Sequence, residues 1–222
     1  MLTFQDFESA RAKETFIEKA IREYRGSDDY ITAGVANEYN RQQNSFIVDF
    51  VNKWYESEEK GIAVCSNLFN RLNTQRCTYS LGNGISFADD ENEEIKSKLG
   101  TDIDDVLFMG AYNALIHKKS YFFFNVDRVV NFTMREFIPL VDEETNEIRA
   151  GIRFWQIDID KPCYAVLYEE DGYTKYKGKN GYIDFKSITE KQGYIKRIEK
   201  SKAFGEKEVG FENYGRQILL LL

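Results

Sequence analysis

The stretch Arg135–Trp155, REFIPLVDEETNEIRAGIRFW, decides the fold class, because it contains two apolar runs joined by an acidic tip. The runs FIPLV and IRAGIRFW are rich in β-branched and aromatic residues, as is typical of strands. The tip, residues 142–147, carries the carboxylates of Asp142, Glu143, Glu144 and Glu147. These could form a metal or catalytic cluster, but a Ca²⁺ loop usually has a glycine at its sharp bend, and this tip has none. We therefore expect the solvated turn of a β-hairpin.

Strand-like segments continue on both sides of this hairpin, from residue 119 to the C-terminus. They are SYFFFNV, VVNFTM, EFIPLV, EIRAGIRFWQID, CYAVLYEEDGYTKYK, YIDF, GYIKRIEK and EVGFENYG. The Asp-Gly pair in EEDGY and the Asn-Gly pair in KGKNGY predict tight hairpins. The terminal ILLLL is expected to be a segment cut off partway through a buried strand or helix.

Before residue 119 the apolar residues recur at helical spacing. We expect helices over 3–25, from a Ser27 cap to about Asn40, from Ser45 over FIVDFVNKWY, over 62–80, over DDENEEIKSKL, and over VLFMGAYNALIHKK behind an Asp102–Asp105 cap. The helix from Ser45 should face inward through Phe46, Ile47, Phe50, Val51 and Trp54. The helix over 62–80 should present a stripe of Val64, Cys65, Leu68, Phe69 and Leu72. ISF, after the LGNG turn, should be a short strand.

The predicted class is therefore α+β, with an N-terminal helical region over 1–118 and a β-rich antiparallel meander over 119–222. The 222 residues are 42% hydrophobic, 30% charged and 15% aromatic, which is a globular composition with sheet or interface content. The net charge of −7 argues against tight duplex binding, although a ring could still guide DNA without gripping it. We find no signal peptide and no run near the roughly 18–20 apolar residues of a membrane span.

Two aspartate groups are candidate metal or catalytic sites. Asp102, Asp104 and Asp105 could resemble a carboxylate pair for a metal, but they precede an apolar helical run, so we expect helix capping. Asp158 and Asp160, in WQIDIDKP, should alternate along a strand and share one face. A strand with one polar face turned to solvent explains that pair equally well.

The remaining reactive residues also have structural explanations. His117, the only histidine, ends a helix beside two lysines, where a cation suits the helix dipole. Cys65, Cys77 and Cys163 are scattered without a CxxC pair, which favours a reduced, intracellular protein with buried thiols. LGNGISF does not continue into a GxGxxG or Walker motif, so nucleotide binding is unsupported. Arg71 and Arg76 lie five residues apart and do not make a basic stripe. We therefore expect no enzyme, with no catalytic, cofactor-binding or metal residues.

Four motifs stand in a fixed order along the chain. They are SNLFNRLNTQRCTYSLGNGISF (66–87), LGTDIDDVLFMGAYNALIHKKSYFFFN (99–125), FTMREFIPLVDEETNEIRAGIRFWQ (132–156) and YAVLYEEDGYTKYKGKNG (164–181). Their order resembles the portal proteins of tailed phages, of the SPP1-like family, over roughly residues 60–215. His117, Lys118 and Lys119 depart from the pattern, because the family often has a small residue and a glycine there. Members are about twice as long, so the resemblance implies a fragment or a truncated prophage product matching the N-terminal part of the wing.

The resemblance implies a structural protein of the virion, at the capsid portal vertex, assembled in the host cytoplasm. Family members self-associate into rings, usually dodecamers, through which double-stranded DNA is packaged and ejected without sequence-specific binding. The terminase large subunit, capsid or scaffold proteins and head-completion proteins would be partners, and no membrane is involved. Two alternatives remain: a small adaptor that presents an edge strand, and a metal-dependent hydrolase using Asp102, Asp104, Asp158 or Asp160.

Overall fold

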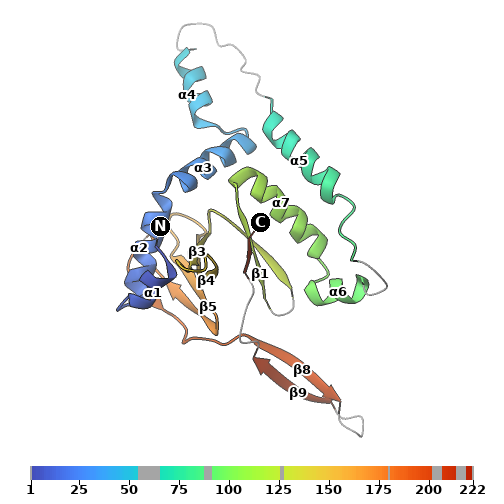
Figure 1. Ribbon diagram of the computed structural model, residues 1–222. Helices are drawn as coiled ribbons and strands as arrows, with labels where there is room; N and C mark the ends of the chain where they lie inside the picture. Colours follow the sequence, from blue (N-terminus) through green and yellow to red (C-terminus); the bar gives the residue numbers. More distant parts are fainter. Residues whose placement is uncertain are drawn as a thin grey trace.

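The computed structural model describes residues 2–54, 66–87, 92–125, 128–179, 181–201, 207–213 and 219–221. Within these ranges the helices come first and the antiparallel strands follow, so the predicted α+β class is confirmed (Figure 1). The helices are α1 (Phe4–Ser9), α2 (Lys13–Arg25), α3 (Asp28–Asn40), α4 (Ser45–Trp54), α5 (Leu68–Leu81), α6 (Asn92–Leu99) and α7 (Ile103–His117).

The single helix expected over 3–25 is wrong, because this segment forms α1 and α2 with a break between them. Ala10 and Ala12 both adopt extended backbone conformations, which end α1 and begin α2. Thr3 and Asp6 form a capping box at the start of α1. The predicted cap of α3 is confirmed, since the Ser27 hydroxyl accepts a hydrogen bond from the Tyr30 N–H.

The strands form separate antiparallel sheets rather than one meander. The strands are β1 (Ser120–Phe124), β2 (Val129–Thr133), β3 (Phe137–Val141), β4 (Ile148–Gln156), β5 (Cys163–Glu169), β6 (Gly172–Lys177), β7 (Lys186–Ser187), β8 (Ile195–Ser201), β9 (Lys207–Asn213) and β10 (Leu219–Leu221). β3 to β7 form a sequential meander, as predicted, whereas β10-β1-β2 is a second sheet and β8-β9 a third. The terminal leucines therefore add a strand beside β1.

Two segments predicted as strands are not strands. In ISF, the Ile85 N–H donates to the Asp104 carboxylate and the Phe87 N–H donates to the Asn92 side chain. These backbone groups therefore bond to side chains and not to a neighbouring strand. YIDF belongs to the loop between β6 and β7, where the Lys179 N–H bonds to the Ile183 carbonyl. The tight hairpin predicted at EEDGY is confirmed by the β5–β6 register, in which Glu169 faces Gly172. The Asn-Gly pair leads instead into that longer loop, and Asn180 lies outside the described residues.

The core joins the first helices to the main sheet. Phe16, Ile17 and Ile21 of α2 are buried in the same cluster as the inner residues of β3 to β6. Gly151 on β4 leaves room for the buried ring of Phe137 on β3, because a Cβ at position 151 would clash with that ring. Residues on both sides of position 118 thus share one hydrophobic core.

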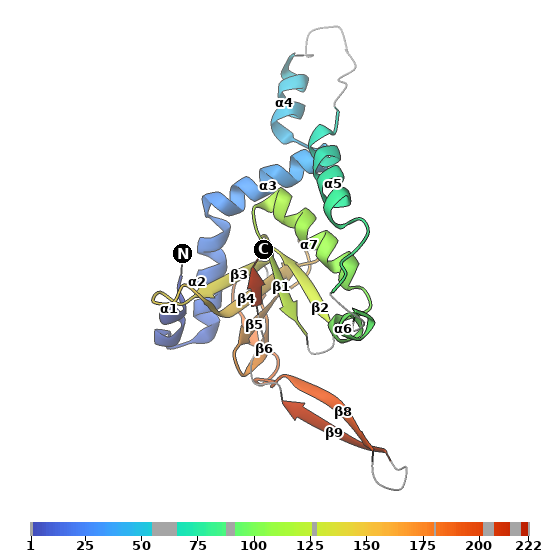
Figure 2. The same cartoon turned by 45° about the vertical axis from the view of Figure 1, so that its right-hand side comes forward.

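Two parts project from this body (Figure 2). At one end α4 extends away from the sheets, while α5 packs along α7, and we call α4 and α5 together the arm. At the other end the β8-β9 ribbon extends from the base of the main sheet. The arm is anchored through Asn40 at the end of α3, which accepts hydrogen bonds from Asn67 and Asn70 and from the Tyr112 hydroxyl.

Candidate functional site

The acidic tip of the β3–β4 hairpin is a turn, as predicted. The Asp142 carboxylate accepts hydrogen bonds from the Glu144 and Thr145 N–H groups at 2.9 and 3.0 Å. These bonds lower the pKa of Asp142. Glu143 accepts a 2.7 Å bond from the Thr3 hydroxyl, so the tip also holds the start of α1. Asp142 therefore shapes the turn, and Glu143 docks it against the start of α1.

The prediction that Asp104 caps α7 is wrong. Its carboxylate instead accepts the Ile85 N–H at 2.9 Å and pairs with Lys96 at 2.7 Å. Lys96, followed by the Ile85 bond, lowers the pKa of Asp104. Asp102 is the N-cap residue but makes no side-chain capping bond, while Asp105, in the first turn, is exposed. Asp104 thus ties α6 and the LGNG turn to α7, which sequence spacing alone did not indicate.

The pair Asp158 and Asp160 does not lie on a strand. β4 ends at Gln156, and both aspartates sit in the exposed turn before β5, where Asp158 accepts its neighbour's N–H at 2.6 Å. Among the described residues, no group of three or more His, Cys, Asp or Glu side chains is placed to hold a metal ion. The described helices also include none that is long and apolar enough to cross a membrane.

His117 is not the cation that its position at the helix end suggested. Its side chain is 6% exposed, and burial, with Arg135 and then Arg41 nearby, lowers its pKa to about 4. The ring is therefore neutral at pH 7. Neither ring nitrogen has a hydrogen-bond partner within the described structure. A buried neutral ring does not serve the helix dipole as a cation would.

The two described cysteines are inert. Cys77 and Cys163 are buried free thiols, and burial raises the pKa of both. A raised pKa keeps the thiol protonated and weakens it as a nucleophile. Cys65 and Val64 lie outside the described residues.

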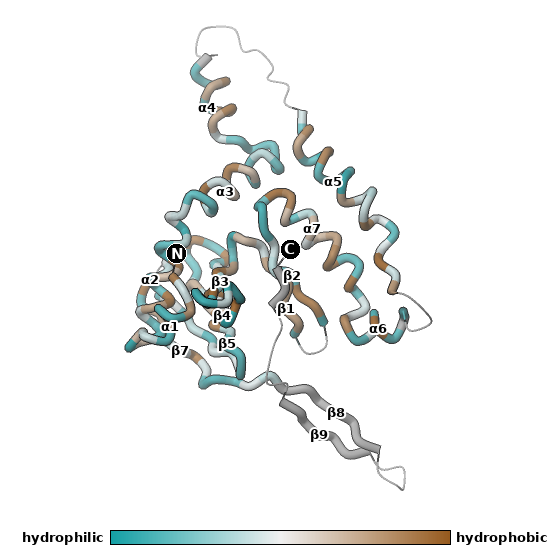
Figure 3. The backbone as a smooth tube through the Cα atoms, in the orientation of Figure 1, coloured by the Kyte–Doolittle hydropathy of each residue, from teal (hydrophilic) through white to brown (hydrophobic). Residues whose placement is uncertain are grey.

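The predicted burial of α4 is wrong. Phe46 is 75% exposed and Phe50 57%, while Ile47 and Val48 are also exposed. The side chain of Trp54 lies outside the described part. Figure 3 shows both apolar and polar positions along α4, and at about 100° per residue Phe46, Ile47, Phe50 and Val51 fall on one side of the helix. The expected inward face of α4 therefore lies open.

The apolar stripe predicted for the next helix also points outward. Leu68, Leu72 and Tyr79, the last 94% exposed, form a line along α5, while Asn73 and Cys77 on the opposite side are buried. Arg71 and Arg76 are exposed and lie about 140° apart around the helix, on either side of that line. We call Leu68, Arg71, Leu72, Arg76 and Tyr79 the outward face of α5. As predicted, the two arginines do not form a basic stripe. They lie on either side of the apolar stripe.

The outward face of α5 has the composition of a protein–protein interface. Tyrosine and arginine are enriched among the residues that contribute most to binding energy. α5 has no aspartate or glutamate, and within the described residues neither arginine has an ion-pair partner. The apolar spacing predicted a helix with an apolar face, but the sequence carried no signal that this face would lie exposed.

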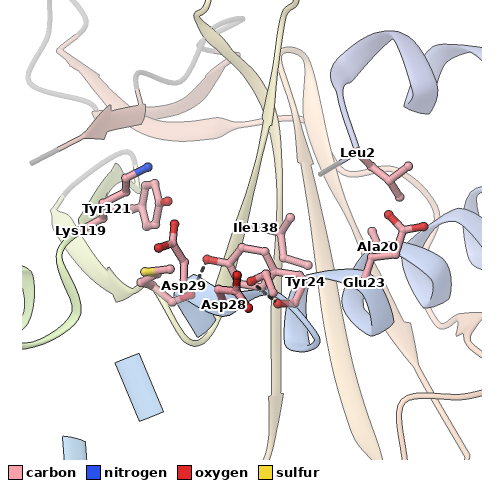
Figure 4. Close-up of a pocket in the computed structure, with 11 residues that line it drawn as sticks. Leu2, Ala20, Glu23, Tyr24, Asp28, Asp29, Lys119, Tyr121 and Ile138 are labelled. Carbon is pink, nitrogen blue, oxygen red and sulfur yellow. Dashed lines mark hydrogen bonds between the residues drawn. The ribbon is translucent and has the colours of Figure 1, made fainter. Parts of the chain in front are cut away.

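A cavity of about 420 Å³ lies at the other end of α3, and sequence analysis did not predict it (Figure 4). Its walls come from α2, the first turn of α3, and the strands β1 and β3, so only the fold brings them together. Glu23, Asp28 and Asp29 line it, together with Lys119 and several apolar and tyrosine side chains. No protein-family model matches the chain, and no curated protein matches it.

Proposed function

We propose that this chain is the N-terminal, wing part of a subunit of a tailed-phage portal ring, through which double-stranded DNA is packaged and ejected. The order of the four motifs between residues 66 and 181 supports this function, and so does the arrangement of helices followed by an antiparallel meander. On this proposal the terminase, the capsid or scaffold proteins and the head-completion proteins dock on the complete ring.

The exposed apolar arm is the observation that carries the proposal. Removing a Phe or Leu side chain from water contributes about 1.5–3 kcal/mol, so the open side chains of α4 and α5 favour association. A helix as short as α4, with 10 residues, is marginal in water without packing partners. A neighbouring subunit would supply those partners.

A ring needs a contact between two different patches, repeated until the circle closes. α4 projects from one side of the body (Figure 1), and the outward face of α5 is exposed, so both can reach an adjacent copy. The net charge of −7 suits a channel that DNA must slide through, because adhesion to phosphates needs positive charge. The ring function therefore needs no catalytic residue from this chain.

The alternative functions fit these observations less well. A carboxylate-metal hydrolase would have to use Asp102, Asp104, Asp158 or Asp160. Asp104 is already bound to Lys96 and Ile85, Asp102 is exposed at the start of α7, and Asp158 and Asp160 lie in an exposed turn. A small adaptor with an edge strand would leave the apolar arm without a stated role. The adaptor also predicts a stable monomer, which the ring test distinguishes.

The test is electron microscopy of the protein expressed from its complete open reading frame. We expect negative-stain images of closed rings with rotational symmetry. Phe46→Ser combined with Leu72→Ser should remove the rings while the circular dichroism spectrum keeps its helical signal. A monodisperse monomer at every concentration would contradict the ring function.

A further inference from the structure

The cavity beside the α2–α3 junction has an apolar floor. Figure 4 shows Tyr24 and Ile138 in its middle part, with Tyr121 toward one end and Leu2 and Ala20 toward the other. The Tyr24 hydroxyl donates a 2.8 Å hydrogen bond to the Met134 carbonyl, so this polar atom of the floor is already satisfied. A volume of about 420 Å³ lies within the roughly 300–1,000 Å³ of pockets that bind ligands. It therefore has room for large side chains.

The charged residues of the cavity are mainly acidic. Its lining has the carboxylates of Glu23, Asp28 and Asp29 against one ammonium group, that of Lys119. Asp29 is paired with Lys118 at 2.7 Å, whereas Glu23 has only a loose 3.8 Å contact with Lys19. Asp28 has no ion-pair partner within the described residues. An occupant with a cationic head and apolar flanks would complement both the floor and the carboxylates.

The outward face of α5 has this complementary chemistry. It places the guanidinium groups of Arg71 and Arg76 on either side of Leu68, Leu72 and Tyr79, with no carboxylate on the helix. Arginine pairs with carboxylates through a planar fork, and its stem packs on apolar surface. A nucleic acid would use the arginines, but it would leave the intervening leucines in water. A second polypeptide surface uses both.

The cavity and the arm are kept apart within one chain. Asp28 and Asp29 occupy the first turn of α3, and Asn40 at its last turn anchors α5. With 13 residues, α3 spans about 20 Å between them. The two surfaces can therefore meet only between copies, and a contact between unlike patches is the kind that closes into a ring.

We propose that the outward face of α5 docks into the acidic cavity of a second copy, with Arg71 and Arg76 near Glu23 and Asp28. This contact rests on the proposed ring function and names the two surfaces that would form its interface. Leu68, Leu72 and Tyr79 cover the apolar floor in this contact. Each copy uses its arm toward one neighbour and its cavity toward the other.

Charge reversal in the complete protein tests this pairing. One variant carries Arg71→Glu and Arg76→Glu, and a second carries Glu23→Arg and Asp28→Arg. Each alone should raise the protein concentration needed for half-maximal assembly by about tenfold or more, because like charges then face each other. Mixing the two variants should restore assembly at equal proportions, since each reversed arm meets a reversed cavity. Light scattering follows the assembly, and native mass spectrometry gives the proportions.

Matched controls keep the outcome specific. Lys177→Glu on β6 and Glu190→Arg after β7 change exposed charges away from both surfaces and should leave assembly unchanged. Assembly of both double variants within about twofold of wild type would overturn the pairing while leaving the ring function intact. Loss of assembly that mixing does not restore would also overturn it, as would reduced DNA binding with normal assembly. A wild-type protein that never assembles would contradict the ring function and the pairing together.

Discussion

α2 and α4 look alike in sequence and differ completely in their surroundings. In both helices the apolar residues predicted an inward face. Ile17 and Ile21 of α2 are fully covered by the main sheet, whereas Phe46 and Phe50 of α4 are mostly exposed. Apolar spacing thus indicates that a helix has a surface to cover, but it does not identify the molecule that covers it. On the proposed ring function, the apolar face of α4 is covered only in the assembled protein.

The largest effect is expected in the body. Phe137 is fully buried between Tyr121 and Phe132, with ring centroids at 4.9 and 5.5 Å. Phe137→Ala should lower the free energy of unfolding by about 3–5 kcal/mol, because it removes apolar contacts and leaves a cavity. Denaturant titration followed by circular dichroism measures this. A loss below about 1 kcal/mol would mean that the body is not packed around this ring.

The next effect is a pH dependence from His117. Its pKa falls from 6.5 to about 4 on folding, so the unfolded state binds the proton first as the pH drops. Stability should be complete above pH 6.5 and decline between pH 6.5 and 4, by up to about 3 kcal/mol. His117→Gln should flatten the stability curve in this window. An unchanged slope in the variant would show that other groups cause the decline.

A smaller effect is expected where Asp104 joins α6 and the LGNG turn to α7. Asp104→Asn keeps the size of the side chain and removes the charge that pairs with Lys96. The melting temperature should fall modestly, and hydrogen exchange should increase at the Ile85 amide. Asp105→Asn, on the exposed first turn, is the matched control. Equal exchange at Ile85 in both variants would rule out the Asp104 link.

The smallest effect on stability should come from the arm. Phe46→Ala removes the same ring as Phe137→Ala but from an exposed site, so the unfolding free energy of the unassembled chain should change by less than about 0.5 kcal/mol. Its effect should appear in assembly instead, measured by light scattering. A large destabilisation of the unassembled chain would mean that α4 is covered within its own chain.

Much of the fold followed from local patterns. The hairpin of β3 and β4, the Ser27 cap and the position of α7 depend on nearby residues, and the sequence predicted them. The break between α1 and α2 was missed because no glycine or proline marks it. The separate sheet of β10, β1 and β2 was missed because β10 pairs with β1, about 100 residues earlier in the chain.

The candidate site was less predictable for the same reason. Residues of α5 were assigned correctly to a helix, but their exposure depends on which elements the fold places beside them. The acidic cavity combines α2, α3, β1 and β3, which no local pattern links. Asp104 and His117 looked like a cap and a cation, and tertiary contacts gave each a different role.

Isotope-mixed cross-linking tests the central claim, that the arm contacts another copy, most directly. Equal amounts of unlabelled and ¹⁵N-labelled complete protein would be assembled together, treated with an amine-reactive cross-linker and digested. Lys53 on α4 is exposed and reports the position of the arm. We predict cross-links from Lys53 that join labelled to unlabelled peptides of the body. Cross-links from Lys53 only within single copies would contradict the claim.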